Sequence, residues 1–256
     1  METRLSVRRN AISVLVGFVA AAMPLPAQTG IENVPVIAKR VEKVFLAPGK
    51  MPNALQATAD GLWILDQQDP NKAHKVRFTD GSVLVEIQTE SIHGSGITFG
   101  GGALWIASTF GLKTLKVDPT NGKTLASFDC PGLVNVDWGS KRRSGAHGLE
   151  WVDGKYWMAV PPTASISLIE PDTGKVVRSI PAPGVRPHGL AWENGFLWCV
   201  ESNHRAIYKL DPKDGRPLAK IQLSPQDPEP HGLTASNGVI WYCDAASRWV
   251  CRLVDP

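Results

Sequence analysis

The stretch HGLAWENGFLWCVESNHRAIYKLDPKDGRPLAKIQL, residues 188–223, contains the pattern that decides the fold of this chain. It divides into four short segments with strand character, at 190–192, 196–200, 206–210 and 218–223. Turns with well-placed Gly and Pro separate them, at Glu193-Asn194-Gly195 and Asp211-Pro212-Lys213-Asp214-Gly215. The stretch therefore predicts one antiparallel sheet of four strands.

Four other segments repeat this unit. In each copy a turn residue stands seven positions after the first residue, and a tryptophan stands ten positions after it. The copies begin at Asn53, Ser95, His147, His188 and His231, and their tryptophans are Trp63, Trp105, Trp157, Trp198 and Trp241. A single sheet cannot bury both faces, whereas sheets stacked around an axis cover one another. We therefore predict an all-β chain that folds as a five-bladed β-propeller of four-stranded antiparallel blades, with the repeated tryptophans packed between the sheets.

The two ends of the repeat region indicate how the ring closes. The last copy stops at Pro256, just before its fourth strand. The early stretch VEKVFLAPG, residues 41–49, is similar to the fourth-strand stretch VVRSIPAPG, residues 176–184. We expect this N-terminal strand to complete the last blade, so that the propeller covers residues 41–256.

Residues 1–27 differ from the rest of the chain. Arg4, Arg8 and Arg9 precede the apolar run AISVLVGFVAAA, residues 11–22, and small residues follow. The run is shorter than the roughly 20 residues of a spanning helix. It predicts a signal peptide over 1–27, a linker over 28–40 and a periplasmic or secreted protein. An uncleaved anchor is the alternative, and Arg8-Arg9 leaves both the Sec and the twin-arginine routes open.

Charge and cysteine usage exclude some classes of partner. Lys and Arg number 27 against 24 Asp and Glu, a net charge of +3 that gives no indication of nucleic acid. We expect no stable membrane span after signal removal, and a monomer. The four cysteines include no C-x-x-C pair, which argues against a zinc knuckle. Two interpretations stay open: a disulfide between Cys243 and Cys251, which flank one predicted hairpin, or four buried small apolar side chains.

The repeat also resembles known families. The pattern G-L/I-x-x-x-x-G-x-L-W, then I-x-x-L-D-P-x-x-G-K/R, is clearest in residues 188–223. Over about residues 41–256 the chain resembles the YVTN and streptogramin-lyase group of propellers. That resemblance implies a lyase that uses a divalent metal, His and Glu to open a macrocyclic ester by elimination. Those lyases have seven blades, whereas this chain has five copies.

A second, more distant resemblance is to the plant and bacterial type of glutaminyl cyclase, which has five blades. The F-T-Q-G-L start of that family would fall at residues 51–55, where this chain has MPNAL. WILD, residues 63–66, stands in place of the following Y-E-S-T-G. The resemblance therefore transfers no site residue to this chain.

The repeat positions predict where a site would lie. In such a fold the first strand of each blade runs beside the axis, and the loops entering it share one face with the loops between second and third strands. Residues at the start of the copies should therefore form an axial ring: Asn53, Ser95, His147, His188 and His231. His93 lies two residues before Ser95 and would add to that ring.

Acidic residues stand at the ends of three predicted second strands, in the copies that begin at Asn53, His188 and His231. Asp66, Glu201 and Asp244 occupy equivalent positions there, which makes His188 with Glu201 and His231 with Asp244 candidate pairs. A carboxylate beside an imidazole fixes its tautomer and raises its basicity. Three hypotheses remain: a structural role, a divalent metal such as Mg²⁺ or Zn²⁺ on His147, His188 and His231, or metal-free acid–base catalysis by His188, His231 and Glu201.

The remaining candidate contacts lie around this ring. We predict that Asn53, Asp66 and Asp244 contact a ligand. The interval before His147 is about ten residues longer than the others, and its extra segment contains Trp138 and Arg142. That segment is either a lid that binds an anionic group or a solvated surface loop.

Three functions follow from these observations. The first is an exported propeller that binds a small molecule or peptide on its axial histidine-rich face. The second is a metal-assisted lyase or hydrolase similar to streptogramin lyase. The third is glutaminyl-peptide cyclotransferase activity. The sequence contains no Ser-His-Asp signature and no phosphate-binding loop that would favour another class of enzyme.

Overall fold

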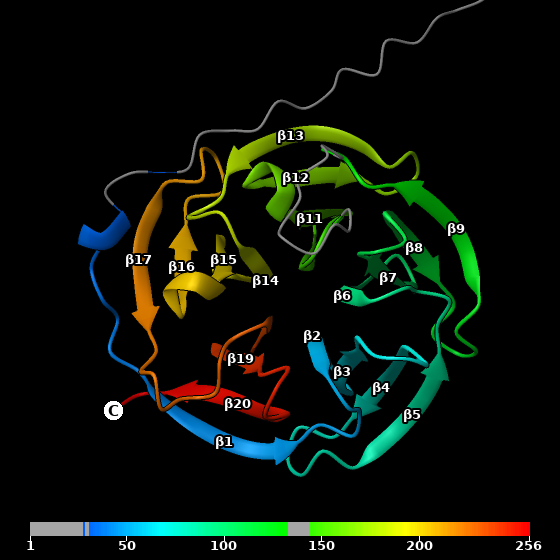
Figure 1. Cartoon of the computed structure of the whole chain (residues 1–256), viewed down its shortest axis with the longest axis horizontal. Helices are drawn as coiled ribbons and strands as arrows, with labels where there is room; N and C mark the ends of the chain where they lie inside the picture. Colours follow the sequence, from blue (N-terminus) through cyan, green and yellow to red (C-terminus); the bar gives the residue numbers. More distant parts are fainter. Residues whose placement is uncertain (1–27, 29–30, 133–143) are drawn as a thin grey trace, which may run out of the picture.

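The chain forms five antiparallel sheets of four strands, arranged in a ring (Figure 1). This computed structural model describes Gln28 and residues 31–132 and 144–256. The first strands β2, β6 and β14 lie innermost, and β1, β5, β9, β13 and β17 form the outer rim (Figure 1). The predicted five-bladed propeller is therefore confirmed.

Each blade follows the order of the repeat, from the axis outward. Blade 1 contains β2 (Pro52–Thr58), β3 (Gly61–Asp66), β4 (Lys72–Val76) and β5 (Val83–Gln88). Blade 2 contains β6 (Gly94–Gly100), β7 (Ala103–Ser108), β8 (Lys113–Val117) and β9 (Thr124–Asp129). Blade 3 contains β10 (Leu149–Val152), β11 (Lys155–Val160), β12 (Ser165–Glu170) and β13 (Lys175–Pro181). Blade 4 contains β14 (Pro187–Glu193), β15 (Phe196–Glu201), β16 (Ala206–Leu210) and β17 (Pro217–Gln222). Blade 5 contains β18 (Gly232–Ser236), β19 (Val239–Cys243), β20 (Trp249–Val254) and β1 (Arg40–Leu46).

The ring closes as the sequence predicts. Strand β1 pairs antiparallel with β20, with Arg40 opposite Val254 and Leu46 opposite Trp249. Blade 5 thus takes three strands from the end of the repeat region and one from its beginning. Because β1 covers the outer edge of β20, the pairing joins the two ends of the propeller.

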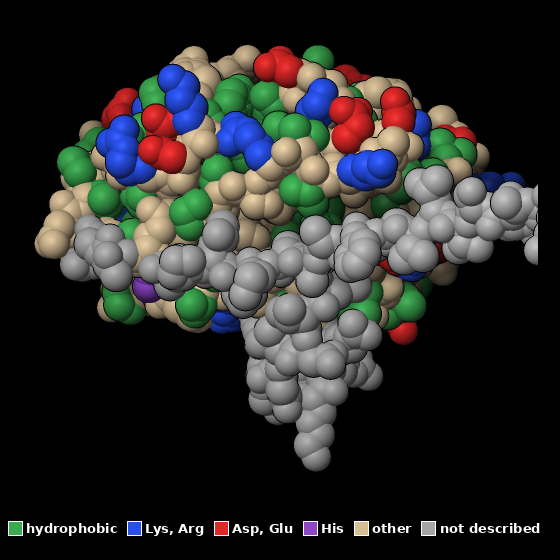
Figure 2. Space-filling view, turned by 90° about the horizontal axis from the view of Figure 1, so that it is seen from above, with side chains coloured by type: hydrophobic (Ala, Val, Ile, Leu, Met, Phe, Trp, Pro, Cys, Tyr) green, Lys and Arg blue, Asp and Glu red, His purple; other side chains and the backbone are tan. Residues whose placement is uncertain are grey.

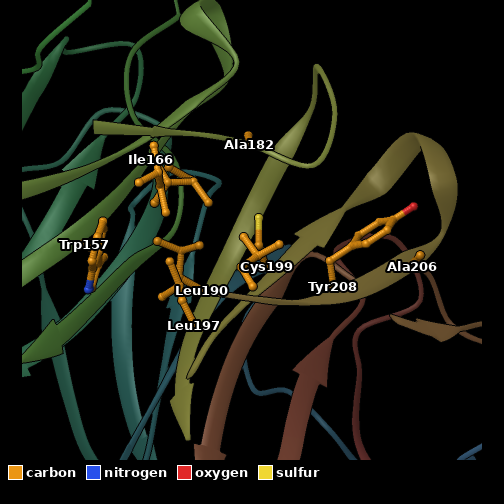
Figure 3. Close-up of a cluster of buried hydrophobic side chains, with 11 residues drawn as sticks. Trp157, Ile166, Ala182, Leu190, Leu197, Cys199, Ala206 and Tyr208 are labelled. Carbon is orange, nitrogen blue, oxygen red and sulfur yellow. The ribbon is translucent and has the colours of Figure 1, made fainter. Parts of the chain in front are cut away.

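The repeated tryptophans fill the spaces between neighbouring sheets. All five are buried, from 1% exposed at Trp105 to 6% exposed at Trp241. Figure 3 shows one such space, where Trp157 of blade 3 faces Leu190, Leu197 and Cys199 of blade 4. Burial of large apolar side chains removes their surface from water, which is the main stabilising contribution between blades.

Most of these tryptophans also carry a cation over one ring face. Lys75 lies 5.8 Å from the Trp63 ring, Lys116 lies 5.4 Å from the Trp105 ring and Arg252 lies 5.9 Å from the Trp241 ring. The tryptophan and the cation are cross-strand partners on the second and third strands. In these blades the repeat therefore places the buried tryptophan and the cation that packs on its ring at paired positions of neighbouring strands.

The four cysteines are unpaired and buried, which decides between the two interpretations left open by the sequence. Cys251 lies directly opposite Tyr242, and Cys243 lies opposite Val250. Cys243 and Cys251 therefore point to opposite faces of the sheet and pack into different core clusters. No disulfide can join them in this register, because each thiol lies on the far side of the sheet from the other.

The segment before β1 packs on the outside of blade 4. The Gln28 side chain donates hydrogen bonds to the backbone oxygens of Pro181 and Gly215, at 3.1 and 2.8 Å. A short 3₁₀ helix, η1 (Ile31–Asn33), follows, and the Ile37 amide donates to the Lys220 oxygen at 2.8 Å. The predicted linker thus lies along β17 as far as β1 (Figure 1).

The face of the molecule seen in Figure 2 shows no single dominant charge. In Figure 2, Lys and Arg side chains lie among Asp and Glu side chains, with apolar side chains between them. Within the described ranges, no helix is long and apolar enough to cross a membrane. The predicted signal peptide, residues 1–27, lies outside the described residues.

Candidate functional site

The axial ring depends on the glycine that follows each histidine. A Cβ at Gly148 would collide with the His188 carbonyl oxygen, and a Cβ at Gly189 would collide with the His231 carbonyl oxygen. The Gly189 amide donates to the His231 oxygen at 2.8 Å. The missing side chains therefore let neighbouring first strands approach closely, and this approach brings the preceding histidines together.

Three imidazoles from three successive blades meet at the axis. The ring centroids of His147 and His188 are 4.5 Å apart at an interplanar angle of 70°. The centroids of His188 and His231 are 5.3 Å apart at 89°. The sequence predicted this convergence from equivalent repeat positions, and the structure brings these side chains together.

Two of these imidazoles are fixed by carbonyl oxygens of the loop that enters their own strand. His188 Nδ1 lies 3.0 Å from the Arg186 oxygen, and His231 Nδ1 lies 3.5 Å from the Glu229 oxygen. A carbonyl oxygen only accepts, so Nδ1 carries the proton in both rings. This arrangement leaves Nε2 as a hydrogen-bond acceptor in the neutral imidazoles.

The site disfavours the charged form of these histidines. Burial lowers the pKa of His147 well below its usual range, and the charge of His188 lowers it further. Burial lowers the pKa of His188 to about 3, and His231 adds to that effect. Burial also lowers the pKa of His231, although the Glu229 carboxylate opposes the shift. All three rings are therefore neutral at pH 7 in the free protein.

The predicted pairs of His188 with Glu201 and His231 with Asp244 do not form. The Glu201 carboxylate accepts hydrogen bonds from the amides of Arg186 at 2.9 Å and Asn203 at 3.3 Å. The Asp244 carboxylate accepts from the Glu229 amide at 3.1 Å and from the Ala246 amide at 2.8 Å. These carboxylates hold the loops that position the histidines and do not contact the imidazoles.

Strand register explains this difference. Glu201 lies opposite Pro187, and the β14–β15 register shifts between Pro187 and Leu190. The acidic residue therefore faces the loop before the histidine. The same arrangement recurs in blade 1, where Asp66 lies opposite Pro52 and accepts from the Met51 amide at 3.0 Å. It also recurs in blade 2, where Ser108 Oγ accepts from the Ile92 amide at 2.8 Å.

The ring opens into a cavity of about 410 Å³ on this face. Of the predicted ring, Asn53, His147, His188 and His231 line it, and His93 adds a fourth imidazole. Ser95, Asp66, Glu201 and Asp244 do not line it; they are buried beside it. Trp138 and Arg142 lie outside the described residues.

Sequence reasoning missed several residues that line the cavity. They are Met51, Gln67, Thr109, Phe110, Ser144, Arg186, Ala245 and Ala246. Gln67, Thr109 and Ala245 each stand one position after the equivalent residues Asp66, Ser108 and Asp244, so extending the repeat alignment by one position would have found them. The His93 ring stacks on Phe110, with centroids 3.9 Å apart, and contacts the Gln67 amide.

The cavity has a basic lining. Arg186 and four histidines line it, whereas none of its described lining residues is Asp or Glu. The Arg186 charge contributes to the lowered pKa of His147, His188 and His231. The Glu229 carboxylate lies 3.9 Å from His231 Nε2.

The histidines of the cavity have part of the chemistry that a metal ion requires. Two Nε2 atoms lack a proton, as a metal ligand requires. However, no three His, Cys, Asp or Glu side chains in the described part of the chain are arranged to hold an ion. The carboxylates are also bound to backbone amides and do not complete a coordination sphere. Divalent metal binding by His147, His188 and His231 therefore stays a prediction of the sequence.

Comparisons with known proteins agree with this fold. No protein-family model and no curated protein sequence matches the chain. Among solved structures, the glutaminyl cyclase of Myxococcus xanthus is 12% identical, with a TM-score of 0.68 over 86% of this chain and 97% of that one. A streptogramin B lyase is 18% identical, with a TM-score of 0.50 over 84% of this chain and 97% of that one. A catalytically inactive Staphylococcus aureus virginiamycin B lyase with quinupristin is also 18% identical, with a TM-score of 0.50 over 84% and 71%. The resemblance predicted from the repeat is thus confirmed for the β-propeller fold.

Proposed function

We propose that this protein binds a small organic anion in the axial cavity. The observation that carries the proposal is the basic lining, in which Arg186 and four histidines surround about 410 Å³ with no described carboxylate among them. Pockets of roughly 300–1,000 Å³ are typical of small-molecule sites. The guanidinium of Arg186 would bind a carboxylate or phosphate group, and the imidazole Nε2 atoms would accept hydrogen bonds from hydroxyl or amino groups of the same ligand.

Binding of an anion should be linked to proton uptake. The three axial histidines are neutral in the free protein because burial and mutual repulsion lower their pKa values. A bound negative charge favours the imidazolium form and raises those values. Affinity should therefore increase as the pH falls from 7.5 to 5.5, by up to about tenfold per pH unit for each proton taken up.

The fold resemblance alone does not select an activity. The features that the five repeat copies share are the strands, the turns and the packed tryptophans, and these have a structural role. The lyase and cyclotransferase hypotheses both need a positioned acid or base. Glu201, the predicted partner of His188, instead accepts two backbone hydrogen bonds and is 0% exposed. Anion binding requires only the lining that is present.

The test is calorimetric titration with inorganic phosphate, succinate and citrate, with succinamide as the uncharged match of succinate. We expect at least one anion to bind, succinamide not to bind, and Arg186→Gln or His188→Asn to weaken binding at least tenfold. Arg216→Gln, which removes an exposed arginine of the same blade, is the matched control and should bind as wild type.

Two results would overturn the proposal. One is equal binding of charged and uncharged probes, which would remove the role of Arg186. The other is stoichiometric binding of Zn²⁺ that requires His147, His188 and His231 and blocks the anions. That outcome would replace the anion site by the metal site that the sequence also suggested. Failure of every anion to bind at millimolar concentration would likewise end the proposal.

A further inference from the structure

A second cavity lies on a different part of the molecule, between blades 5 and 1. It has a volume of about 630 Å³. Its lining includes Thr58 at the end of β2, Ala59 of the β2–β3 turn and Asn237 of the β18–β19 turn, together with Phe78, Trp241 and Arg252. These turns join first to second strands, whereas the axial cavity is lined by the loops that enter first strands. The two cavities share no lining residue.

Comparison between blades shows how this junction differs from two others. The residues four positions after the start of each repeat copy are Ala57, Phe99, Trp151, Trp192 and Ala235 in blades 1 to 5. In blades 3 and 4 this residue is a tryptophan that packs toward the preceding blade's tryptophan. Blades 1 and 5 place only a methyl group there.

The junction between blades 2 and 3 shows what the large residue does. Trp151 stacks on Trp105 of blade 2, with ring centroids 5.9 Å apart and an interplanar angle of 25°. The Trp151 amide donates to Thr98 Oγ1 at 2.8 Å. A Cβ at Gly100 would collide with the Trp151 indole, which shows that the ring lies directly on the preceding strand. In the next junction, Trp192 packs against the cluster that contains Trp157.

The junction between blades 5 and 1 has the same backbone without that ring. The Ala57 amide donates to Thr234 Oγ1 at 2.9 Å, the counterpart of the bond made by Trp151. Trp241 stands where Trp105 stands, and its face is bounded by Phe78, with centroids 5.4 Å apart, and by Arg252. The open space therefore lies where the fold places an indole in two other junctions.

The polar side of the cavity provides hydrogen-bond donors. Among the described bonds, the Arg252 guanidinium donates through Nη2 to Glu42 at 2.7 Å. A guanidinium has five N–H donors in a planar fork, so the Arg252 head, 41% exposed as a side chain, retains donors for an acceptor group. A ligand here would combine a flat apolar body with an acceptor at one end.

We propose that this cavity, which we call the seam site, binds a small molecule with a bicyclic aromatic ring and a hydrogen-bond acceptor such as a carboxylate or carboxamide. The ring takes the place that Trp151 and Trp192 occupy in their junctions and packs on Trp241. The acceptor group bonds to Arg252. The seam site is independent of the anion site at the axis.

The experiment is calorimetric titration with indole-3-acetamide as the probe, because this uncharged molecule lacks the negative charge that the anion site at the axis requires. Ala57→Trp should fill the seam site with the residue used by blades 3 and 4 and weaken binding at least tenfold. Phe99→Trp is the matched control, because it adds an indole at the equivalent position of another junction. It should leave binding unchanged, as should His188→Asn at the axis.

A second variant guards against misfolding of the first. Ala57→Leu adds less volume and should still weaken binding, and circular dichroism should show the same β-sheet signal in all variants. Cyclohexylacetamide, which has the acceptor group without the aromatic ring, should bind at least tenfold more weakly than indole-3-acetamide. The proposal is wrong if the wild type does not bind indole-3-acetamide at millimolar concentration, if Ala57→Trp or Ala57→Leu binds as the wild type does, or if His188→Asn removes binding.

Discussion

Blades 3 to 5 and blades 1 and 2 use the same axial position in different ways. Blades 3, 4 and 5 place histidine there, whereas blades 1 and 2 place Asn53 and Ser95. The anchoring is nevertheless shared, because Ser95 Oγ bonds to the oxygen of the residue two positions earlier, at 3.3 Å, as His188 and His231 do. The fold therefore accepts several residues at this position, and histidine is not needed to build the ring. Its presence in three neighbouring blades is better explained by the cavity that these rings line.

The glycine after the axial residue offers the most disruptive test of this comparison. Gly148→Ala would place a Cβ against the His188 carbonyl oxygen. We expect it to lower the free energy of unfolding by about 3 kcal/mol, because two first strands must separate. Ala54→Gly is the control, since blade 1 already has alanine at this position; it should cost about 1 kcal/mol or less. Urea denaturation measures both, and equal losses would contradict the close approach of blades 3 and 4.

Glu201 and His188, one of the predicted pairs, should contribute differently to the free energy of unfolding. Glu201→Ala leaves the amides of Arg186 and Asn203 without their acceptor, so we expect it to lower the free energy of unfolding by about 2–3 kcal/mol. His188→Asn gives blade 4 the axial residue of blade 1 and should cost less than about 1 kcal/mol. The measurement is chemical denaturation at pH 7.5. A larger loss for His188→Asn would mean that the histidine, and not the carboxylate, holds this loop.

The pH dependence of stability provides a further test, in which the expected loss develops gradually as the pH falls. The folded-state pKa of His188 is lowered to about 3, whereas the unfolded value is about 6.5. Below pH 6.5 the unfolded chain binds a proton that the folded chain does not. The contribution of His188 to the free energy of unfolding is therefore fully present above that pH and is lost as the pH falls toward 3. His188 should contribute a slope of about 1.4 kcal/mol per pH unit between roughly pH 5.5 and 4.

The matched variant for this slope is His188→Asn. It should show a shallower loss of stability over the same interval than the wild type, measured by denaturant midpoints at half-unit steps of pH. His204 lies in the same blade, outside the axial ring, and is more exposed, so His204→Asn should change the slope less. Equal slopes in wild type and His188→Asn would show that this imidazole titrates normally in the folded protein.

The repeat made much of the molecule predictable. Five copies with a shared tryptophan implied five sheets, and the similarity of residues 41–49 to a fourth strand implied the closure by β1. The convergence of His147, His188 and His231 followed from the same alignment. In each case, equivalent sequence positions determine equivalent places in the ring.

Local register was not predictable in the same way. The shift between Pro187 and Leu190 turns Glu201 toward the loop, and nothing in the residue types shows that shift. Likewise, Cys243 and Cys251 flank one hairpin, but the pairing of Tyr242 with Cys251 decides which face each thiol occupies. The sequence shows alanine at position 57, where blades 3 and 4 have tryptophan, but its meaning depends on knowing that Trp151 covers the preceding blade.

The strand that completes blade 5 has a consequence for how the protein is made. During synthesis on the ribosome, β1 emerges before any of its partner strands, and β20 follows roughly two hundred residues later. The outer strand must remain unpaired until the last blade is available, so the ring closes through a pairing of very high sequence separation. We expect the final step of folding to be the meeting of these two segments, and a chain shortened by a few residues at either one to lose the cooperative unfolding of all five blades.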